Sequence, residues 1–300
     1  MIWIDQILQG VLLGGYYALI ACGLSFMYGV MRVINLAHGS LAVLAAFLIW
    51  SLSDNLKISP FLALVAIVPV MGAAGWLLQR TVLERSLRSG ALTPLLSTFG
   101  IAVVIDNLLF ERFGADTRSL APNIGDLAFN SWSLPGGVTV GQLALLTFAV
   151  AVALLGGLQL FLRHAPLGRA IRATADDPDT AELVGIDSRT VYAAAAAIAL
   201  GTVAIAGAFL GVRATFDPYS GAAQLIFAFE AVVIGGTGSL WGTLLGGVAL
   251  GVAQNIGAQI FPQGFLLAGH ALFFAVLAVR FFGAGRDPLA FIRVGRRRPA

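Results

Sequence analysis

The chain has 300 residues, of which 58% are hydrophobic and 11% are charged, and its net charge is +3. Soluble domains carry about 25% charged residues, so the composition excludes an ordinary soluble domain and predicts an all-α polytopic membrane protein. The one lysine, Lys57, follows Leu56, so no Gly-Lys-Ser/Thr phosphate loop exists and the chain is not a Walker-type ATPase by itself. The single cysteine excludes an internal disulfide framework and a cysteine-rich metal site, and the presence of only three histidines argues against a histidine cluster. A small basic excess in a membrane chain is typical of cytoplasmic loops, so we expect no binding to nucleic acid.

Nine apolar segments are expected to cross or enter the membrane, since a spanning helix needs about 20 apolar residues. They are residues 7–30, 39–53, 58–79, 93–111, 141–162, 190–212, 223–237, 242–261 and 264–282. The second and seventh segments are shorter than a normal span, so either could be tilted, re-entrant or broken, and we predict eight or nine transmembrane helices. Small residues recur four apart, which lets helix backbones pack closely. These are Gly242, Gly246, Gly247 and Gly251, and also Gly207 and Gly211.

The placement of basic residues predicts the orientation, because loops rich in Lys and Arg tend to stay in the cytoplasm. With nine spans and an external N-terminus, all but four of the 18 basic residues fall inside. The four exceptions are Lys57, Arg112, Arg118 and Arg213. We therefore expect a cytoplasmic C-terminus, with the arginine-rich tail of residues 285–300 lying against anionic lipid or binding a partner. Residues 1–6 lack a basic n-region, so the first apolar segment is interpreted as a span and not as a cleaved signal.

The most polar stretch is an internal loop, residues 163–189. Asp177 is a good N-cap, Pro178 suits the first helical position, and Gly185 suits the left-handed position after a helix. The pattern predicts a two-turn helix over residues 178–184. Two interpretations remain open, a knob for a soluble partner and an amphipathic helix resting on the membrane surface.

Polar residues within or beside apolar segments are the candidates for function, because unsatisfied polar groups are costly in lipid. Asn35 and His38 lie between the first two segments, where Asn35 could cap the following helix and expose its amides to an anion, or both residues could only satisfy the backbone. Glu230 could line a path or brace a helix. Asp106 is better explained as a hydrated helix end.

Three stretches carry a resemblance to a known family. The first lies in the internal loop and consists of Gly168 to Ala170, Arg172-Ala173, Asp177 to Ala181 and Leu183 to Ile186. The second lies near the N-terminus and consists of Gly14 to Leu19, Gly29 and Asn35 to Gly39. The third is Val232 to Gly242. The loop resembles the cytoplasmic coupling loop of permease subunits of ABC importers. The three stretches together cover nearly the whole chain and occur in the order expected of the branched-chain amino acid permease family, so the chain resembles the LivH-type subunit of that family.

The resemblance implies one transmembrane permease domain over residues 1–300 in the inner membrane, containing the coupling loop of residues 163–189. Such a subunit imports branched-chain or similar apolar amino acids and has no enzymatic activity, catalytic residue, cofactor or metal site. It would pair with a second related permease in a heterodimer, although a homodimer remains open, and with two cytoplasmic ATPase subunits and an external solute-binding protein. The expected ATPase-coupling residues are Gly168, Arg169, Ala173, Asp177, Ala181, Leu183, Gly185 and Ile186. The candidates for the translocation path are Asn35, His38 and Glu230.

Other functions remain open at this point. A permease of the same family could carry urea, a short amide or another small solute. A secondary transporter would instead use coupling ions near the bilayer midplane, for which Asp106 and Glu230 are the available carboxylates. An intramembrane enzyme would need a nucleophile paired with a base, and no such pair stands out in the spans.

Overall fold

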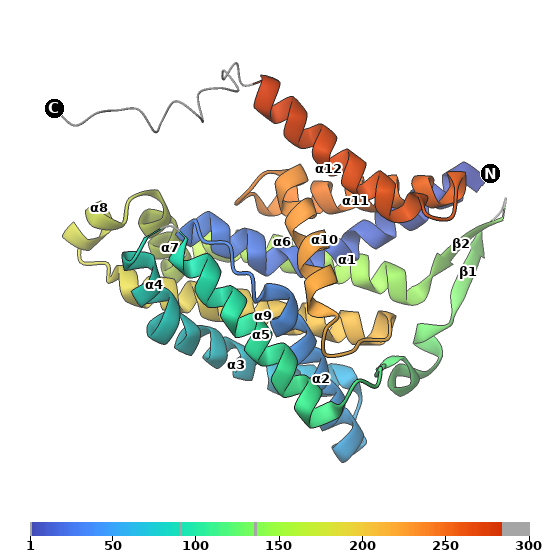
Figure 1. The fold of residues 1–300 in the computed structure, drawn as a ribbon, viewed down its shortest axis with the longest axis horizontal. Coiled ribbons are helices and arrows are strands. Elements are labelled where there is room, and N and C mark those ends of the chain that lie inside the picture. Colours follow the sequence, from blue (N-terminus) through green and yellow to red (C-terminus); the bar gives the residue numbers. More distant parts are fainter. Residues whose placement is uncertain (1, 91, 135–136, 284–300) are drawn as a thin grey trace.

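The computed structural model describes residues 2–90, 92–134 and 137–283, so the predicted lipid-bound tail lies outside the described residues. The chain is almost entirely helical (Figure 1), which confirms the predicted all-α class. The elements in chain order are α1 (Ile2–Met31), α2 (His38–Leu56), α3 (Pro60–Leu78), η1 (Gln79–Leu83), α4 (Glu84–Arg88), α5 (Thr93–Phe113), η2 (Ala121–Ala128), β1 (Ser131–Leu134), β2 (Val138–Gly141), α6 (Gln142–His164), α7 (Pro166–Asp176), α8 (Pro178–Leu183), α9 (Ser188–Arg213), α10 (Gly221–Gly235), α11 (Leu240–Ile260) and α12 (Gly264–Gly283).

Each of the nine predicted apolar segments coincides with a helix. Seven helices within the described residues are long and apolar enough to cross a membrane, namely α1, α2, α3 with its continuation to Leu87, α5, α6, α9 and α12. An eighth candidate is the pair formed by α10 and α11, which is bent by 114°. Of the predicted eight or nine spans, the lower value therefore falls within the seven or eight candidates among the described residues, and the short seventh segment is one half of the bent pair.

The sharp bend between α10 and α11 has a local cause in the sequence. Gly236 and Gly238 have φ angles of 102° and 81°, in the left-handed region that glycine adopts without steric cost. Ser239 then begins α11, since its hydroxyl accepts a hydrogen bond from the amide of Gly242 at 3.1 Å. The two helices also touch at their backbones, because a Cβ on Gly235 would lie 1.8 Å from the carbonyl oxygen of Gly242.

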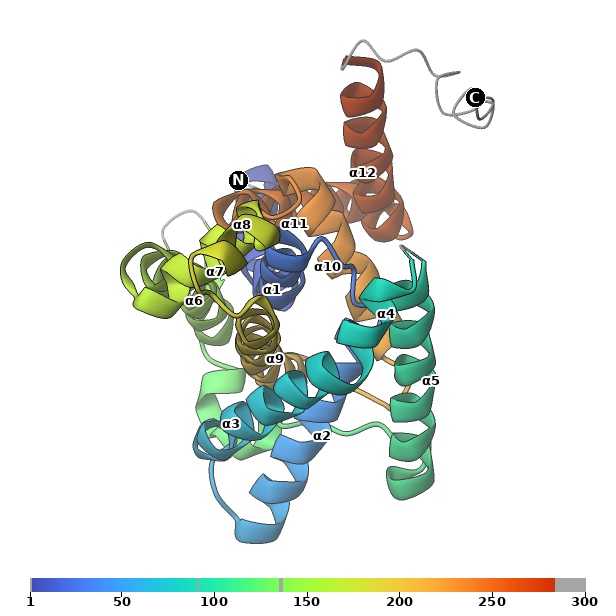
Figure 2. The ribbon, with the colours of Figure 1, turned by 90° about the vertical axis from the view of Figure 1, so that its left-hand side faces the viewer.

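Two helices form the centre of the molecule and the others surround them. Over their most apolar windows, 72% of α1 and 78% of α9 are buried, against 22% of α3, α5 and α6 and 6% of α12. Figure 2 shows α12 standing at the edge of the bundle, away from α9. The outer helices therefore present their apolar side chains to lipid or to another membrane subunit.

The predicted small-residue spacing is used for packing within this chain. A Cβ on Gly247 would lie 2.6 Å from the carbonyl oxygen of Gly14, and one on Gly251 would lie 2.3 Å from that of Gly10. Thus α11 runs antiparallel to α1 at close range. On the other side of the centre, a Cβ on Gly207 would lie 2.4 Å from the carbonyl oxygen of Ala42, which brings α9 against α2.

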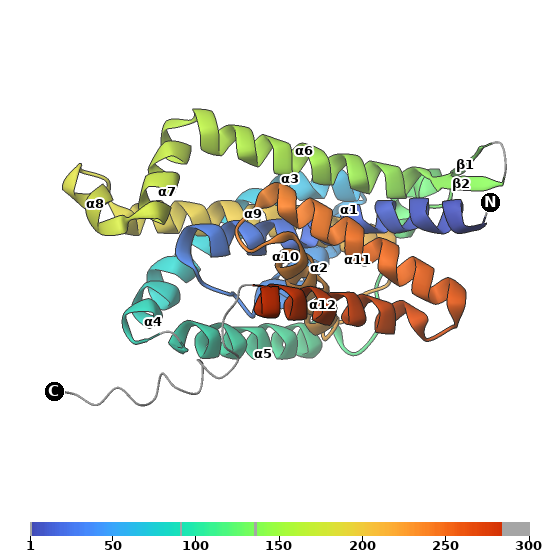
Figure 3. The same ribbon diagram turned by 90° about the horizontal axis from the view of Figure 1, so that it is seen from above.

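The long helices give the molecule two distinct ends (Figure 3). At one end lie α4, α7 and α8, and at the other lie the start of α1 and a hairpin of β1 and β2. The hairpin is antiparallel, with Ser131 opposite Gly141, and it is tied to α1 by a hydrogen bond from the amide of Thr139 to Asp5 at 3.1 Å. We name these the α8 end and the hairpin end.

Candidate coupling loop and translocation path

The predicted loop at residues 163–189 contains two helices, α7 and α8, joined at Asp177. The first of these, α7, was not predicted. It packs tightly on the end of α6, because a Cβ on Gly168 would lie 2.2 Å from the carbonyl oxygen of Phe161. Ile171 and Thr174 are buried on the same face. The loop is thus a folded projection and not an irregular connection.

The short helix α8 forms as its capping residues predict. The carboxylate of Asp177 accepts hydrogen bonds from the amides of Asp179 and Thr180 at 3.1 and 3.2 Å and from the Thr180 hydroxyl at 2.6 Å. These donors, led by the Thr180 hydroxyl, hold the pKa of Asp177 below its ordinary value. At the other end Gly185 has a φ of 87°, and its amide donates to the carbonyl of Glu182 at 3.0 Å. The helix ends at Leu183, one residue earlier than predicted.

The two faces of α8 differ in exposure. Ala181 is buried, whereas Leu183 is 86% exposed and Val184 is 74% exposed. Two adjacent apolar side chains on a polar projection are available for contact with something outside this chain. Ala181 instead holds α8 against the rest of the loop, because its carbonyl accepts a hydrogen bond from the amide of Ile186 at 3.1 Å.

The loop is braced against the extension of α3. Arg80 donates to the hydroxyl of Thr190 at 2.9 Å, and that hydroxyl also bonds to Asp187, the N-cap of α9. Arg189 lies 3.4 Å from Glu84 of α4. The hydrogen bonds to Thr190 and to the amide of Arg189 lower the pKa of Asp187. The start of α9 is also joined to α8, because the hydroxyl of Ser188 donates to the carbonyl of Pro178 at 3.3 Å.

The remaining predicted loop residues lie on α7 and beside α8. Arg169 donates to the carbonyl of His164 at 2.7 Å and is exposed, as is Ala173. Ile186 is partly buried against the core. The structure thus brings the eight predicted coupling residues into one projection, of which Gly168 and Ala181 face inward.

Asn35 does not cap α2 as was considered from the sequence. The helix has Ala37 at its N-cap with no side-chain hydrogen bond, because the side-chain oxygen Oδ1 of Asn35 instead accepts from the amide of Ala37 at 3.0 Å in a turn before the helix. His38 begins α2 and bonds through Nε2 to the carbonyl of Ile20 at 2.7 Å. Both side chains are buried, and among the described residues Asn35 Nδ2 and His38 Nδ1 have no hydrogen-bond partner.

This turn is where α2 meets the start of α10. A Cβ on Gly39 would lie 1.9 Å from the carbonyl oxygen of Gly221, so only glycine allows the contact. Thr98 of α5 accepts from the amide of Leu36 at 3.0 Å. Asp106 of α5 is partly buried, and its Oδ1 has no hydrogen-bond partner among the described residues.

Glu230 is buried in α10 and contacts a residue that the sequence analysis did not select. Its Oε1 lies 2.5 Å from Nδ1 of His270 in α12, while its Oε2 has no hydrogen-bond partner among the described residues. The side chain of Glu230 is 4% exposed and that of His270 is 40% exposed. The signal for His270 was available, since a histidine within an apolar span is itself unusual.

A second polar group missed from the sequence lies around the tyrosine pair of α1. Tyr16 donates to Gln224 of α10 at 2.9 Å, and Tyr17 donates to Gln254 of α11 at 2.5 Å. The guanidinium of Arg213, at the end of α9, lies 4.7 Å from the centroid of the Tyr16 ring. Glutamines inside apolar segments and a paired tyrosine were the signals present in the sequence.

Two charged residues lie in this group of helices, Arg213 at the end of α9 and Glu230 in α10. Arg213 lies over the ring of Tyr16 in α1, and the buried carboxylate of Glu230 lies against His270 of α12. Such an arrangement can hold a zwitterion, with the cation near its carboxylate and the carboxylate near its ammonium group. Among the described residues, no group of three or more His, Cys, Asp or Glu is placed to bind a metal ion.

One protein family and several known proteins match this chain over most of its length. The family described as "Branched-chain amino acid transport system / permease component" matches residues 6–280. The chain is 32% identical to the high-affinity branched-chain amino acid transport system permease protein BraD of Pseudomonas aeruginosa, over 86% of this chain and 87% of that protein. It is 29% identical to the corresponding LivH protein of Escherichia coli K12, over 92% and 93%. A fructose import permease protein, FrcC of Rhizobium meliloti, is 25% identical over 81% and 69%. No solved structure matches the chain.

Proposed function

The chain belongs to the family of branched-chain amino acid transport permease components, and from this premise we propose that it imports branched-chain or similarly apolar amino acids as the permease subunit of an ABC importer. Separate ATPase subunits drive the movement, because the chain has no phosphate loop of its own. The single transmembrane domain is a multi-pass permease of the inner membrane.

The observation that carries this proposal is the folded projection at the α8 end. Leu183 and Val184 form an exposed apolar tip on α8, and the loop behind it is bonded to α9. The tip docks on an ATPase subunit. Closure of two ATPases then shifts α8, and α9 carries the shift into the centre of the bundle.

The distribution of basic residues supports a cytoplasmic α8 end. Arg280, near the end of α12, donates to the carbonyl of Ile234 beside the α10–α11 turn, so α12 ends on the same side as α8. The described basic residues at the α8 end include Arg80, Arg85, Arg163, Arg169, Arg172, Arg189 and Arg280. Because loops rich in Arg stay in the cytoplasm, the hairpin end faces outward and receives an external solute-binding protein.

The translocation path passes the buried polar groups of α1, α2 and α10. Glu230 has a carboxylate oxygen free for a substrate ammonium group, and Arg213 with the tyrosine pair attracts the substrate carboxylate at the outer side. Asn35 and His38 line the inner part of the path, where their free nitrogen atoms contact solute or water. A second, related permease subunit covers the exposed side of α10 and α12 and completes the path as a heterodimer.

Transport by the complete assembly tests the function. Proteoliposomes containing this chain, its neighbouring permease, the ATPases and the binding protein are supplied with ATP and radiolabelled leucine, and matched vesicles lack this chain. We expect leucine uptake only when the chain is present, with unlabelled isoleucine and valine as competitors. ATP-dependent uptake of urea or a short amide without leucine uptake would show that the substrate is not a branched-chain amino acid. An absence of any ATP-dependent uptake would overturn the proposal.

A further inference from the structure

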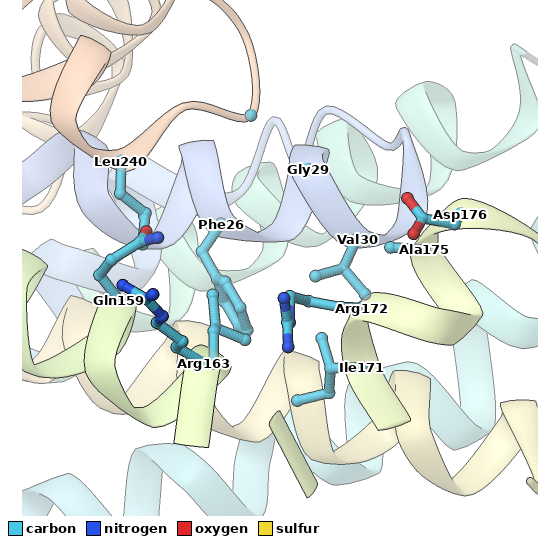
Figure 4. A pocket seen from close by; sticks show the side chains of 12 residues that line it. Phe26, Gly29, Val30, Gln159, Arg163, Ile171, Arg172, Ala175, Asp176 and Leu240 are labelled. Carbon is cyan, nitrogen blue, oxygen red and sulfur yellow. The ribbon is translucent and has the colours of Figure 1, made fainter. Parts of the chain in front are cut away.

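A cavity of about 490 Å³ opens near the α8 end of the bundle, outside the path described above (Figure 4). Its walls come from the last turns of α1 and α6, from α7, and from the turn before α11. Phe26, Val30, Leu162, Ile171 and Leu240 make the apolar part of the lining. The polar part is formed by Gln159, Arg163, Arg172 and Asp176.

The two arginines outnumber Asp176, the one acidic residue of the lining, so the cavity has a net positive charge. Figure 4 shows Arg163 and Arg172 reaching into the same space beside Gln159, while Asp176 lies at the opposite edge. Among the described residues neither guanidinium has an ion pair or a side-chain hydrogen bond. Two like charges that face one cavity repel each other, so an anion between them is stabilised by both. Guanidinium groups match phosphate oxygens with two parallel hydrogen bonds.

The cavity lies near one end of the spans, where a transmembrane helix meets the headgroup layer. It lies within the last turns of the spans α1 and α6, which end at Met31 and His164. Close by, Trp241 is 44% exposed and lies against Gly156 of α6. Tryptophan is enriched where a span meets the membrane surface. Phe26, Val30 and Leu240 form an apolar wall beside the arginines, against which an acyl chain can lie.

We propose that this cavity binds the phosphate group of an anionic phospholipid from the leaflet at the α8 end, held by Arg163 and Arg172, with an acyl chain against Phe26 and Leu240. Basic pockets between spans on the cytoplasmic side are suited to such headgroups. The bound lipid contacts α1, α6, α7 and the turn before α11 at once. It therefore fastens the α7–α8 projection to the bundle and stiffens the connection through which α8 acts.

Lipid retention and lipid-dependent activity test the proposal in the complete assembly. The assembly is placed in nanodiscs of phosphatidylcholine containing rising fractions of phosphatidylglycerol, and native mass spectrometry counts the phosphatidylglycerol retained after delipidation. The test variants are Arg172→Gln and the double variant Arg163→Gln/Arg172→Gln. The control is Arg85→Gln, which removes an exposed positive charge at the same end but outside the cavity.

Each arginine near a membrane surface changes the affinity for an anionic lipid by about fivefold. The fraction of phosphatidylglycerol that half-saturates the site should therefore rise about fivefold in the single variant and about 30-fold in the double variant. The double variant should lose one phosphatidylglycerol per copy of this chain, and Arg85→Gln should lose none. Equal retention in the double variant and the unmodified chain would overturn the proposal. The proposal would also be overturned if inorganic phosphate raised the ATPase activity of the assembly in pure phosphatidylcholine as much as phosphatidylglycerol does. The ligand would then be a free anion and not a lipid.

Discussion

The exposed apolar tip of α8 offers the sharpest test of how this permease is driven. Changing Leu183 and Val184 together to Asp removes the apolar surface without touching the capping bonds of Asp177 or the left-handed Gly185. The helix itself should therefore remain folded. The expected loss lies in the contact with an ATPase subunit.

The size of the loss follows from the exposed area. Fully burying a Leu or Val side chain contributes about 1.5–3 kcal/mol, and these two are 86% and 74% exposed in the isolated chain. If an ATPase groove covers half of this surface, the pair contributes about 1.2–2.4 kcal/mol to docking. This free energy corresponds to an affinity about 8- to 60-fold lower in the variant, and the added carboxylates can only increase the loss.

The assay measures ATPase binding to the reconstituted permease pair together with the stimulation of ATP hydrolysis by the loaded binding protein. The matched control is Leu92→Asp, which changes a 71% exposed leucine at the same end but outside α7 and α8. We expect the control to bind and couple normally. Full coupling in the Leu183→Asp/Val184→Asp variant, or an equal defect in the control, would refute docking through α8.

Further predictions concern the path, the packing and the loop. Glu230→Gln keeps an oxygen that can bond to His270 but loses the negative charge. The value of kcat/KM for uptake should therefore fall about 10- to 100-fold while the subunits still assemble. An unchanged value would assign Glu230 to helix bracing. Gly39→Ala forces a Cβ to within 1.9 Å of a carbonyl oxygen and should destabilise the fold by about 1–3 kcal/mol, seen as a lower Tm, whereas Gly157→Ala meets nothing within 4 Å and should not lower it. The lowered pKa of Asp177 means that its ionised cap is complete above the unfolded pKa near 3.9 and is lost as pH falls through the folded value. Hydrogen-exchange protection of α8 should therefore stay constant from pH 8 to 5 and fall only below about pH 4, and Asp177→Asn should abolish that fall; a transition near pH 6 would contradict the assignment.

Long apolar segments made most of the fold predictable. Each predicted span coincides with a helix because a 20-residue apolar stretch has one stable form in lipid. The bend at Gly236 and Gly238 was less visible, since glycine both breaks helices and packs them, and only the backbone shows which occurs. The β1–β2 hairpin was missed because four-residue strands are too short to show a period, although Pro135-Gly136-Gly137 is a turn signal.

The candidate site was predictable only in part, for a physical reason. The α8 caps are local, so Asp177 and Gly185 could be assigned from neighbouring residues alone. By contrast, the pairing of Glu230 with His270 joins residues 40 positions apart on different helices. Tyr16 and Gln224 are separated by 208 positions. No local rule gives such pairs. For Asn35 the sequence left two roles open, a helix cap and a bond to the backbone of the junction, and its side-chain oxygen bonds to the turn amide of Ala37.

The energy source of transport tests the central claim most directly. Leucine uptake by the complete assembly is measured with ATP and with a non-hydrolysable ATP analogue, each in the presence and absence of ionophores that collapse ion gradients. The account predicts uptake that requires hydrolysable ATP and is unaffected by ionophores. Uptake that persists with the analogue and disappears with ionophores would show an ion-coupled transporter and contradict the account.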